Sequence, residues 1–122
     1  MARILFIDDN LTILALAGSV LTAGGHHATL AVNGRAGISA YHREPFDLVV
    51  TDIFMPEQDG IETIEEIRQS PRRTPILAIS GSHRGGEYLR AATAVGANAT
   101  LEKPFTPDQL IEAVDQLLKA FA

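Results

Sequence analysis

Polar residues that could take part in chemistry stand at the ends of four short apolar runs in this sequence. They are three acids, a hydroxyl and an ammonium: Asp8, Asp9, Asp52, Ser80 and Lys103. Three carboxylates a few ångströms apart would repel one another by roughly 3 to 4 kcal/mol per pair at an effective dielectric constant of about 20, so a cation should lie among them. Mg²⁺ suits such an all-oxygen site, and Lys103 would add a second positive charge. A carboxylate nucleophile, a metal ion and hydroxyl and ammonium donors are the parts that phosphoryl transfer requires.

The apolar runs have the length of β-strands and alternate with segments of helical periodicity. The five runs occupy residues 4–7, 28–32, 48–51, 76–79 and 99–101. This alternation predicts an α/β fold, a doubly wound five-stranded parallel sheet with five helices on its two faces. Ligands of such sheets bind beyond the carboxyl ends of the strands, so the fold would bring the five polar residues to one edge.

Two of the five predicted helices have clear boundaries in the sequence. One is expected between Asp59 and the Ser70-Pro71 pair, with the apolar stripe Ile61, Ile64 and Ile67. The last begins at a capping box with proline in the first helical position, over residues 106–109. Its predicted stripe is Leu110, Ile111, Val114, Leu117, Leu118 and Phe121.

Length and composition exclude several classes of protein. The 122 residues, 46% of them hydrophobic, predict one domain over residues 1–122 with a core of its own. The formal net charge of −5 argues against nucleic-acid binding, which requires clustered basic side chains. The chain has no cysteine, no apolar segment of membrane-spanning length and no secretory signal, so we expect a cytoplasmic protein that binds no membrane.

Over almost its whole length the sequence resembles the receiver domains of two-component response regulators, in particular single-domain receivers of the CheY type. The segments that carry the resemblance are Phe6-Ile7-Asp8-Asp9-Asn10, residues 47–56, residues 59–62, Ser80-Gly81, Gly96-Ala97 and Lys103-Pro104-Phe105. The resemblance implies the flavodoxin-like strand order 2-1-3-4-5, which the chemotaxis member of the family illustrates. It also implies a cis peptide bond between Lys103 and Pro104.

The resemblance assigns a role to each matching residue. Asp52 would be the phosphoacceptor, taking a phosphoryl group from the phosphohistidine of a sensor histidine kinase or of a histidine phosphotransfer protein. Lys103 would pair with that group, and the hydroxyl of Ser80 would swing to hydrogen-bond it, which is the switch. Asp9 and Asp52 would bind Mg²⁺ directly. Asp8 would bind it through a water molecule, and the backbone carbonyl of Phe54 would complete the protein ligands.

The same resemblance implies a signalling role. The chain would not be an enzyme in the usual sense, because it would catalyse only its own phosphorylation and dephosphorylation. It would act as a monomer or weak dimer whose phosphorylated form binds a downstream protein target. The sequence identifies neither that target nor the cognate kinase.

One position departs from the family pattern. Three residues before the lysine, the family typically carries an aromatic ring that moves with the switch hydroxyl, but this chain has Thr100. Tyr88, in the fourth predicted helix, is a candidate substitute and is equally consistent with a packing residue. Phe54 and Ser82 occupy positions that modulate loss of the phosphoryl group in the family. An apolar Phe54 would offer an attacking water no hydrogen-bond partner.

The first predicted helix, which ends before Gly24, has no charged side chain, and residues 10–34 contain no Asp, Glu, Lys or Arg. Solvated helices usually carry charges on their exposed face. This face is therefore either a modestly apolar surface or a docking face for the phosphodonor or for a second copy of the chain. The predicted buried stripe is Ile13, Leu16, Ala17, Val20 and Leu21. The predicted exposed residues are Leu11, Leu14, Ala15 and Gly18.

Two alternative functions stay open on the sequence. A pseudo-receiver would bind partners without phosphorylation, and Thr100 favours that reading. A phosphatase of the haloacid dehalogenase type would use Asp8 as its nucleophile, because residues 4–12 resemble the first motif of that family. The acid expected two residues later is Asn10, however, and an amide cannot exchange the required proton.

Overall fold

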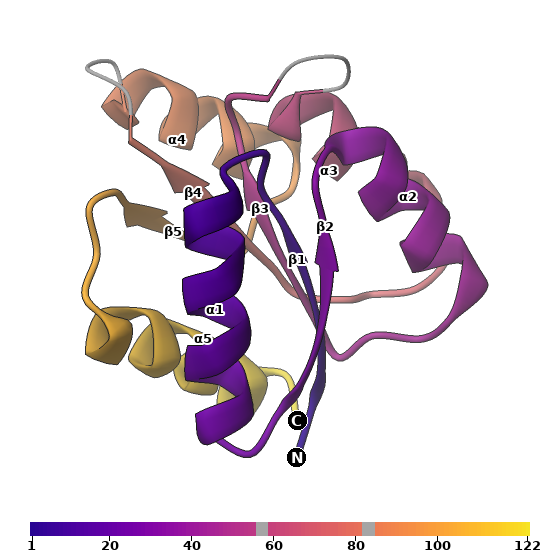
Figure 1. The fold of residues 1–122 in the computed structure, drawn as a ribbon. Coiled ribbons are helices and arrows are strands. Elements are labelled where there is room, and N and C mark those ends of the chain that lie inside the picture. Colours follow the sequence, from indigo (N-terminus) through magenta and orange to yellow (C-terminus); the bar gives the residue numbers. More distant parts are fainter. Residues whose placement is uncertain (56–58, 82–84) are drawn as a thin grey trace.

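Five strands and five helices alternate along the chain in the computed structural model, which describes residues 1–55, 59–81 and 85–122 (Figure 1). The strands are β1 (Arg3–Ile7), β2 (His27–Ala31), β3 (Leu48–Asp52), β4 (Ile76–Ser80) and β5 (Ala99–Glu102). The helices are α1 (Leu11–Ala23), α2 (Gly34–Arg43), α3 (Gly60–Gln69), α4 (Gly85–Val95) and α5 (Pro107–Ala120). The predicted order of elements is confirmed.

The strands form one parallel sheet in the order β2-β1-β3-β4-β5. This is the predicted doubly wound, flavodoxin-like order, and the fold class is confirmed. Ile7 of β1 pairs with Thr51 of β3, and Asp52 of β3 pairs with Ile79 of β4. All the strands therefore end at the same edge of the sheet, with β1, β3 and β4 at its centre.

Two apolar cores cover the two faces of the sheet, because successive side chains of a strand point to opposite faces. Leu5 and Ile7 of β1 join a core with α2, α3 and α4, whereas Ile4 and Phe6 join a core with α1 and α5. Figure 1 shows α1 and α5 on one side of the sheet and the other helices beyond it. Strands β3 and β4 are buried on both faces, as expected for the centre of a parallel sheet.

The buried face of α1 matches the prediction only in part, since Ala17 and Leu21 are buried as predicted but Leu14 and Leu16 have exchanged places. Leu14 is 5% exposed and belongs to the core, whereas Leu16 is 38% exposed and faces solvent. The residues buried in α1 are Leu14, Ala17 and Leu21. The helix is apolar on almost every side, so two stripes fit the helical period equally well. Its packing against α5 and the sheet, not its periodicity, selects the buried stripe.

One further expectation about burial and one strand boundary were wrong. Phe121 is 50% exposed. It is the C-cap of α5 and follows the last helical residue, so the helical period no longer sets the direction of its side chain. Val32 is 48% exposed and lies after β2, which begins one residue earlier than the apolar run suggested. Both residues stand at the end of an element, where an apolar pattern no longer fixes which side is buried.

One other feature matches what was expected. The Lys103–Pro104 peptide bond is cis, as the resemblance implied. No helix in the described part of the chain has the length and apolar character needed to cross a membrane.

Candidate functional site

Three carboxyl groups meet at the carboxyl edge of the sheet, where the sequence predicted them. Asp8 and Asp9 follow β1, and Asp52 is the last residue of the neighbouring β3. One carboxylate oxygen from each lies within 4.8 Å of the other two. Asp8 is fully buried, Asp52 is 4% exposed and Asp9 is exposed. The cluster thus has two buried acids and one in contact with solvent.

The beginning of α1 fixes the position of Asp8. The side-chain oxygen of Asn10 caps α1 by accepting the backbone N–H groups of Thr12 at 2.9 Å and Ile13 at 3.1 Å. The backbone N–H of Asn10 donates to Asp8 Oδ1 at 2.9 Å. The backbone N–H of Asp8 donates to the carbonyl of Ala31 in β2 at 3.0 Å. Both the backbone and the carboxylate of Asp8 are therefore held by regular elements.

The ammonium of Lys103 lies among the acids. Its Nζ is 2.8 Å from Asp8 Oδ2 and 3.4 Å from Asp52 Oδ2. The backbone N–H of Lys103 donates to the carbonyl of Ser80 at 2.8 Å, which ties the lysine to the end of β4. Gly81 leaves room for the lysine side chain, since a Cβ at this glycine would lie 2.8 Å from Lys103 Cβ. Close packing and the backbone together aim the ammonium at the two buried carboxylates.

The environment of Asp52 alters its acidity. Burial raises the pKa of the Asp52 carboxyl from 3.8 to about 6, and the negative charge of Asp8 adds to the rise. The charge of Lys103 and its hydrogen bond lower this pKa, and Asp9 raises it slightly. The group stays mostly ionised at neutral pH but is more basic than an ordinary aspartate. A buried carboxylate with a raised pKa at a cleft is typical of a functional site.

We expect Asp52→Asn to stabilise the metal-free protein by about 1 to 3 kcal/mol near neutral pH, because the variant removes a buried charge. The folded-state pKa of Asp52 lies above its unfolded value, so the folded protein binds the extra proton between about pH 4 and pH 6. The wild type therefore loses stability as the pH rises through that window. The gain of the variant should grow over the same window and then level off. Urea unfolding in EDTA at several pH values measures it, and a variant less stable than the wild type above pH 6 contradicts this electrostatic account.

The buried hydroxyl of Ser80 lies at the end of β4. Ser80 is the last residue of β4 and is 1% exposed. Its Oγ makes no hydrogen bond to any residue that the structure describes. A buried hydroxyl without a partner costs about 1 to 3 kcal/mol, so we expect a polar atom from outside the described residues to bond it.

A cavity of about 320 Å³ opens onto Asp52 and is also lined by Phe54, Gly81 and Lys103. Thr100 does not reach it. This residue lies on β5 and lines a separate groove beside α4, with Leu89, Arg90, Thr93 and Ala94. Ser82, a predicted modulating residue, lies outside the described residues.

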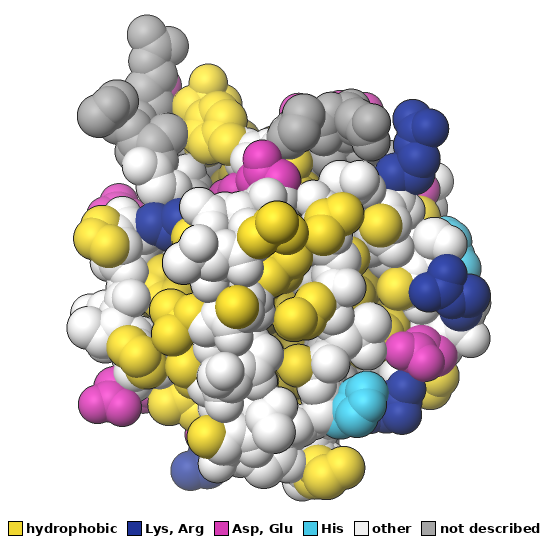
Figure 2. All heavy atoms as spheres, viewed as in Figure 1, with side chains coloured by type: hydrophobic (Ala, Val, Ile, Leu, Met, Phe, Trp, Pro, Cys, Tyr) yellow, Lys and Arg dark blue, Asp and Glu magenta, His cyan; other side chains and the backbone are white. Residues whose placement is uncertain are grey.

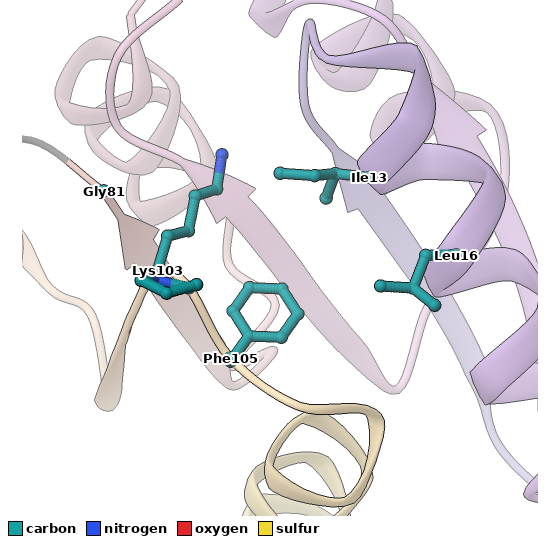
Figure 3. Close-up of a pocket in the computed structure, with 6 residues that line it drawn as sticks. Ile13, Leu16, Gly81, Lys103 and Phe105 are labelled. Carbon is teal, nitrogen blue, oxygen red and sulfur yellow. The ribbon is translucent and has the colours of Figure 1, made fainter.

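A second, more apolar groove of about 350 Å³ runs from the lysine toward α1 (Figure 3). Ile13 and Leu16 project from α1 toward Phe105 and Lys103, which lie on the segment after β5. Figure 2 shows apolar and uncharged side chains along α1 on this face. The helical pattern predicted Leu16 in the core, so its place in this groove was not expected.

The family model for the response regulator receiver domain matches residues 4–115, and the chain belongs to that family. The fold and the acidic edge of the sheet define the same class of protein, a signalling domain of two-component systems.

Individual relatives extend this assignment. The chain is 31% identical over 118 residues to the chemotaxis protein CheY of Thermotoga maritima, covering 96% of this chain and 98% of that protein. It is 33% identical over 121 residues to the transcriptional regulatory protein GlrR of Escherichia coli, covering 99% of this chain but only 27% of that protein. Other relatives are parts of sensor histidine kinases. Among solved structures, CheY4 of Vibrio cholerae is similar with a TM-score of 0.89 and 30% identity, covering 96% of this chain and 98% of that one.

Proposed function

We propose that this chain is a cytoplasmic signalling domain that accepts a phosphoryl group on Asp52 from the phosphohistidine of a sensor kinase or a histidine phosphotransfer protein. Two observations at neighbouring strand ends together carry the proposal. Asp52 lies 3.4 Å from the ammonium of Lys103, and the buried hydroxyl of Ser80 has no hydrogen-bond partner in the described part of the chain. The phosphorylated form then binds a downstream protein target.

In the proposed transfer, a carboxylate oxygen of Asp52 attacks phosphorus. The phosphorus–nitrogen bond to the donor imidazole breaks, and its electron pair returns to that nitrogen. Burial raises the pKa of Asp52 to about 6 in the metal-free protein, so its carboxylate is ionised at neutral pH, the form in which it can attack. Lys103 neutralises charge on the transferred oxygens, and the Ser80 hydroxyl donates a hydrogen bond to one of them.

Receiver domains bind Mg²⁺ at an acidic pocket, and the residues present here fit that ion. The three carboxylates outnumber the single ammonium of Lys103 among them, and all offer oxygen ligands. We propose that Asp9 and Asp52 hold the ion directly, that Asp8 holds it through water, and that the Phe54 carbonyl completes the protein ligands. When bound, the ion neutralises charge on the transferred oxygens.

The phosphatase alternative receives no support from the site. The side-chain oxygen of Asn10, at the position of the required acid, is engaged by two backbone N–H groups of α1. Asp8 itself is fully buried, with one oxygen accepting the Asn10 N–H and the other facing Lys103. We therefore assign the nucleophile to Asp52.

The test is the intact mass of the protein after incubation with acetyl phosphate, with and without Mg²⁺, for the wild type and for Asp52→Asn. We expect a gain of one phosphoryl group only with Mg²⁺ and only in the wild type. Beryllofluoride binding, followed by NMR, guards against rapid hydrolysis. A wild type that forms no adduct and binds no beryllofluoride would favour the pseudo-receiver function instead.

We further propose that the uncharged face of α1 docks the phosphodonor, because the groove lined by Leu16 and Phe105 leads directly to Lys103. Leu16→Glu is expected to slow phosphotransfer from a purified histidine kinase at least about tenfold, since the charge would have to be buried against an apolar partner. Labelling by acetyl phosphate should change less than about twofold.

The control for docking is Leu30→Glu. Leu30 is an exposed leucine on β2 that does not line this groove. The rate of phosphotransfer is measured with one histidine kinase chosen from a purified panel. Leu16→Glu should lower this rate, and Leu30→Glu should not. Equal effects of Leu16→Glu with kinase and with acetyl phosphate rule out a docking role for this face.

A further inference from the structure

An aromatic contact joins α4 to the edge of the cavity that opens onto Asp52. Phe54 lies two residues beyond Asp52 and lines that cavity with it. The ring of Tyr88 stands edge-on to the ring of Phe54, with 4.2 Å between centroids and 73° between planes. Edge-to-face pairs of this kind attract beyond the burial of their surface, and a 4.2 Å separation is a close example.

The two rings differ in how firmly the fold holds them. Tyr88 is partly buried and packs against the core formed with α2, α3 and α4. Phe54 is 40% exposed and belongs to neither apolar core among the described residues. The contact therefore lets an anchored residue of α4 position an otherwise loosely held ring beside Asp52.

Residue 100, which lines the groove beside α4, is a threonine and not the aromatic residue typical of the family. Thr100 lines it together with residues of α4 and does not line the cavity at Asp52. The described aromatic side chain that connects α4 to Phe54 is instead Tyr88, which α4 itself supplies.

We propose that Tyr88 is a positioning residue, which holds the Phe54 ring against the cavity and so sets the lifetime of the phosphoryl group on Asp52 and couples α4 to its presence. This inference rests on the proposed function. In hydrolysis, a water oxygen attacks phosphorus, the bond from phosphorus to the Asp52 oxygen breaks with its electron pair returning to the carboxylate, and inorganic phosphate leaves as the water proton passes to solvent. A fixed apolar ring occupies part of the approach to phosphorus and offers that water no hydrogen bond.

The test compares Tyr88→Leu and Tyr88→Phe, each made in the wild type and in Phe54→Ala. Each protein is phosphorylated with acetyl phosphate and Mg²⁺, the donor is removed, and loss of the adduct is followed by intact mass. We expect Tyr88→Leu to speed this loss roughly 2- to 12-fold, the factor that corresponds to one aromatic pair. Tyr88→Phe keeps the ring and should stay within about twofold of the wild type. In Phe54→Ala, Tyr88→Leu should have no further effect.

A second readout follows the coupling to α4 directly. The chain has two tyrosines and no tryptophan. Tyr41 is fully buried, and its hydroxyl lies 2.9 Å from Thr74 Oγ1. Because Tyr41 is held in the core, we expect Tyr88 to be the tyrosine whose fluorescence responds to the site. Mg²⁺ with beryllofluoride should change the tyrosine emission of the wild type, and Tyr88→Phe should abolish that change.

Two kinds of failure can be told apart. If the wild type gains no phosphoryl group, the proposed function fails and this inference fails with it. If every protein is phosphorylated but Tyr88→Leu has equal effects, or none, with and without Phe54, only the role of Tyr88 is overturned. An emission change that Tyr88→Phe retains overturns the coupling to α4.

Discussion

Lys103→Met is expected to lower the free energy of unfolding of the metal-free protein by about 3 to 5 kcal/mol near neutral pH, because it leaves a buried carboxylate without its cation. Asp8 is fully buried, and the Lys103 ammonium lies 2.8 Å from its Oδ2. The methionine keeps the unbranched stem that lines the groove toward α1 and removes only the charge. The loss of stability then measures what the ammonium contributes.

The pH dependence of this loss follows from the acids. The positive charge of Lys103 lowers the pKa of Asp52, so its removal pushes a value already raised to about 6 still higher. A carboxyl whose folded-state pKa is raised destabilises the folded protein only above its unfolded pKa, and the loss grows until the pH passes the folded-state pKa. The difference between wild type and variant should therefore shrink as the pH falls from about 7 to about 5. Mg²⁺ should recover part of the loss, because it binds the folded site and supplies the missing positive charge.

Lys119→Met is the matched control, since the chain has two lysines and Lys119 is exposed near the end of α5. It should change the free energy of unfolding by no more than about 0.5 kcal/mol. Urea unfolding in EDTA, with and without added Mg²⁺, gives all of these quantities. Similar small losses for both variants contradict the role of Lys103 as the counter-charge of Asp8.

Gly60→Ala is expected to destabilise the protein by about 3 kcal/mol, since overpacking against the backbone cannot be relieved by a side-chain rotation. Gly60 is the first residue of α3, and its N–H donates to the carbonyl of Ile53 at 2.9 Å. A Cβ at this position would stand against the carbonyl oxygen of Asp52 and 2.6 Å from Ile53 Cα. Room for the added methyl group must come from moving the end of β3 or the beginning of α3.

The displaced backbone is that of the proposed phosphoacceptor, so the amide NMR signals of Asp52 and Ile53 should shift in Gly60→Ala. Gly18→Ala serves as the control, because Gly18 lies inside α1 and a Cβ there would meet only the end of the Leu30 side chain at 3.3 Å. It should be neutral or stabilise by up to about 1 kcal/mol through helix propensity. Thermal and urea unfolding of the two variants test the difference, and equal stabilities contradict the close approach of α3 to β3.

The sequence by itself determined the order of the elements, the strand order through the family resemblance, and the edge of the sheet at which the acids gather. The order and the boundaries of the elements depend on local signals. The capping box is one example: the Thr106 side chain accepts the Gln109 N–H at 3.1 Å, and Gln109 Oε1 accepts the Thr106 N–H at 2.8 Å. Asp59 likewise caps α3 by accepting the Glu62 N–H at 2.9 Å. Such signals act over a few residues and need no knowledge of the rest of the chain.

Tertiary structure alone decided which face of α1 is buried, that Lys103 lies closer to Asp8 than to Asp52, and that Tyr88 meets Phe54. The rotation of α1 could not be predicted because its sequence is apolar on most sides, so only the shape of its neighbours distinguishes one stripe from another. The two contacts join segments that are far apart along the chain. Their geometry depends on how the helices and loops pack around the sheet, and no local pattern encodes a distance between side chains on separate elements.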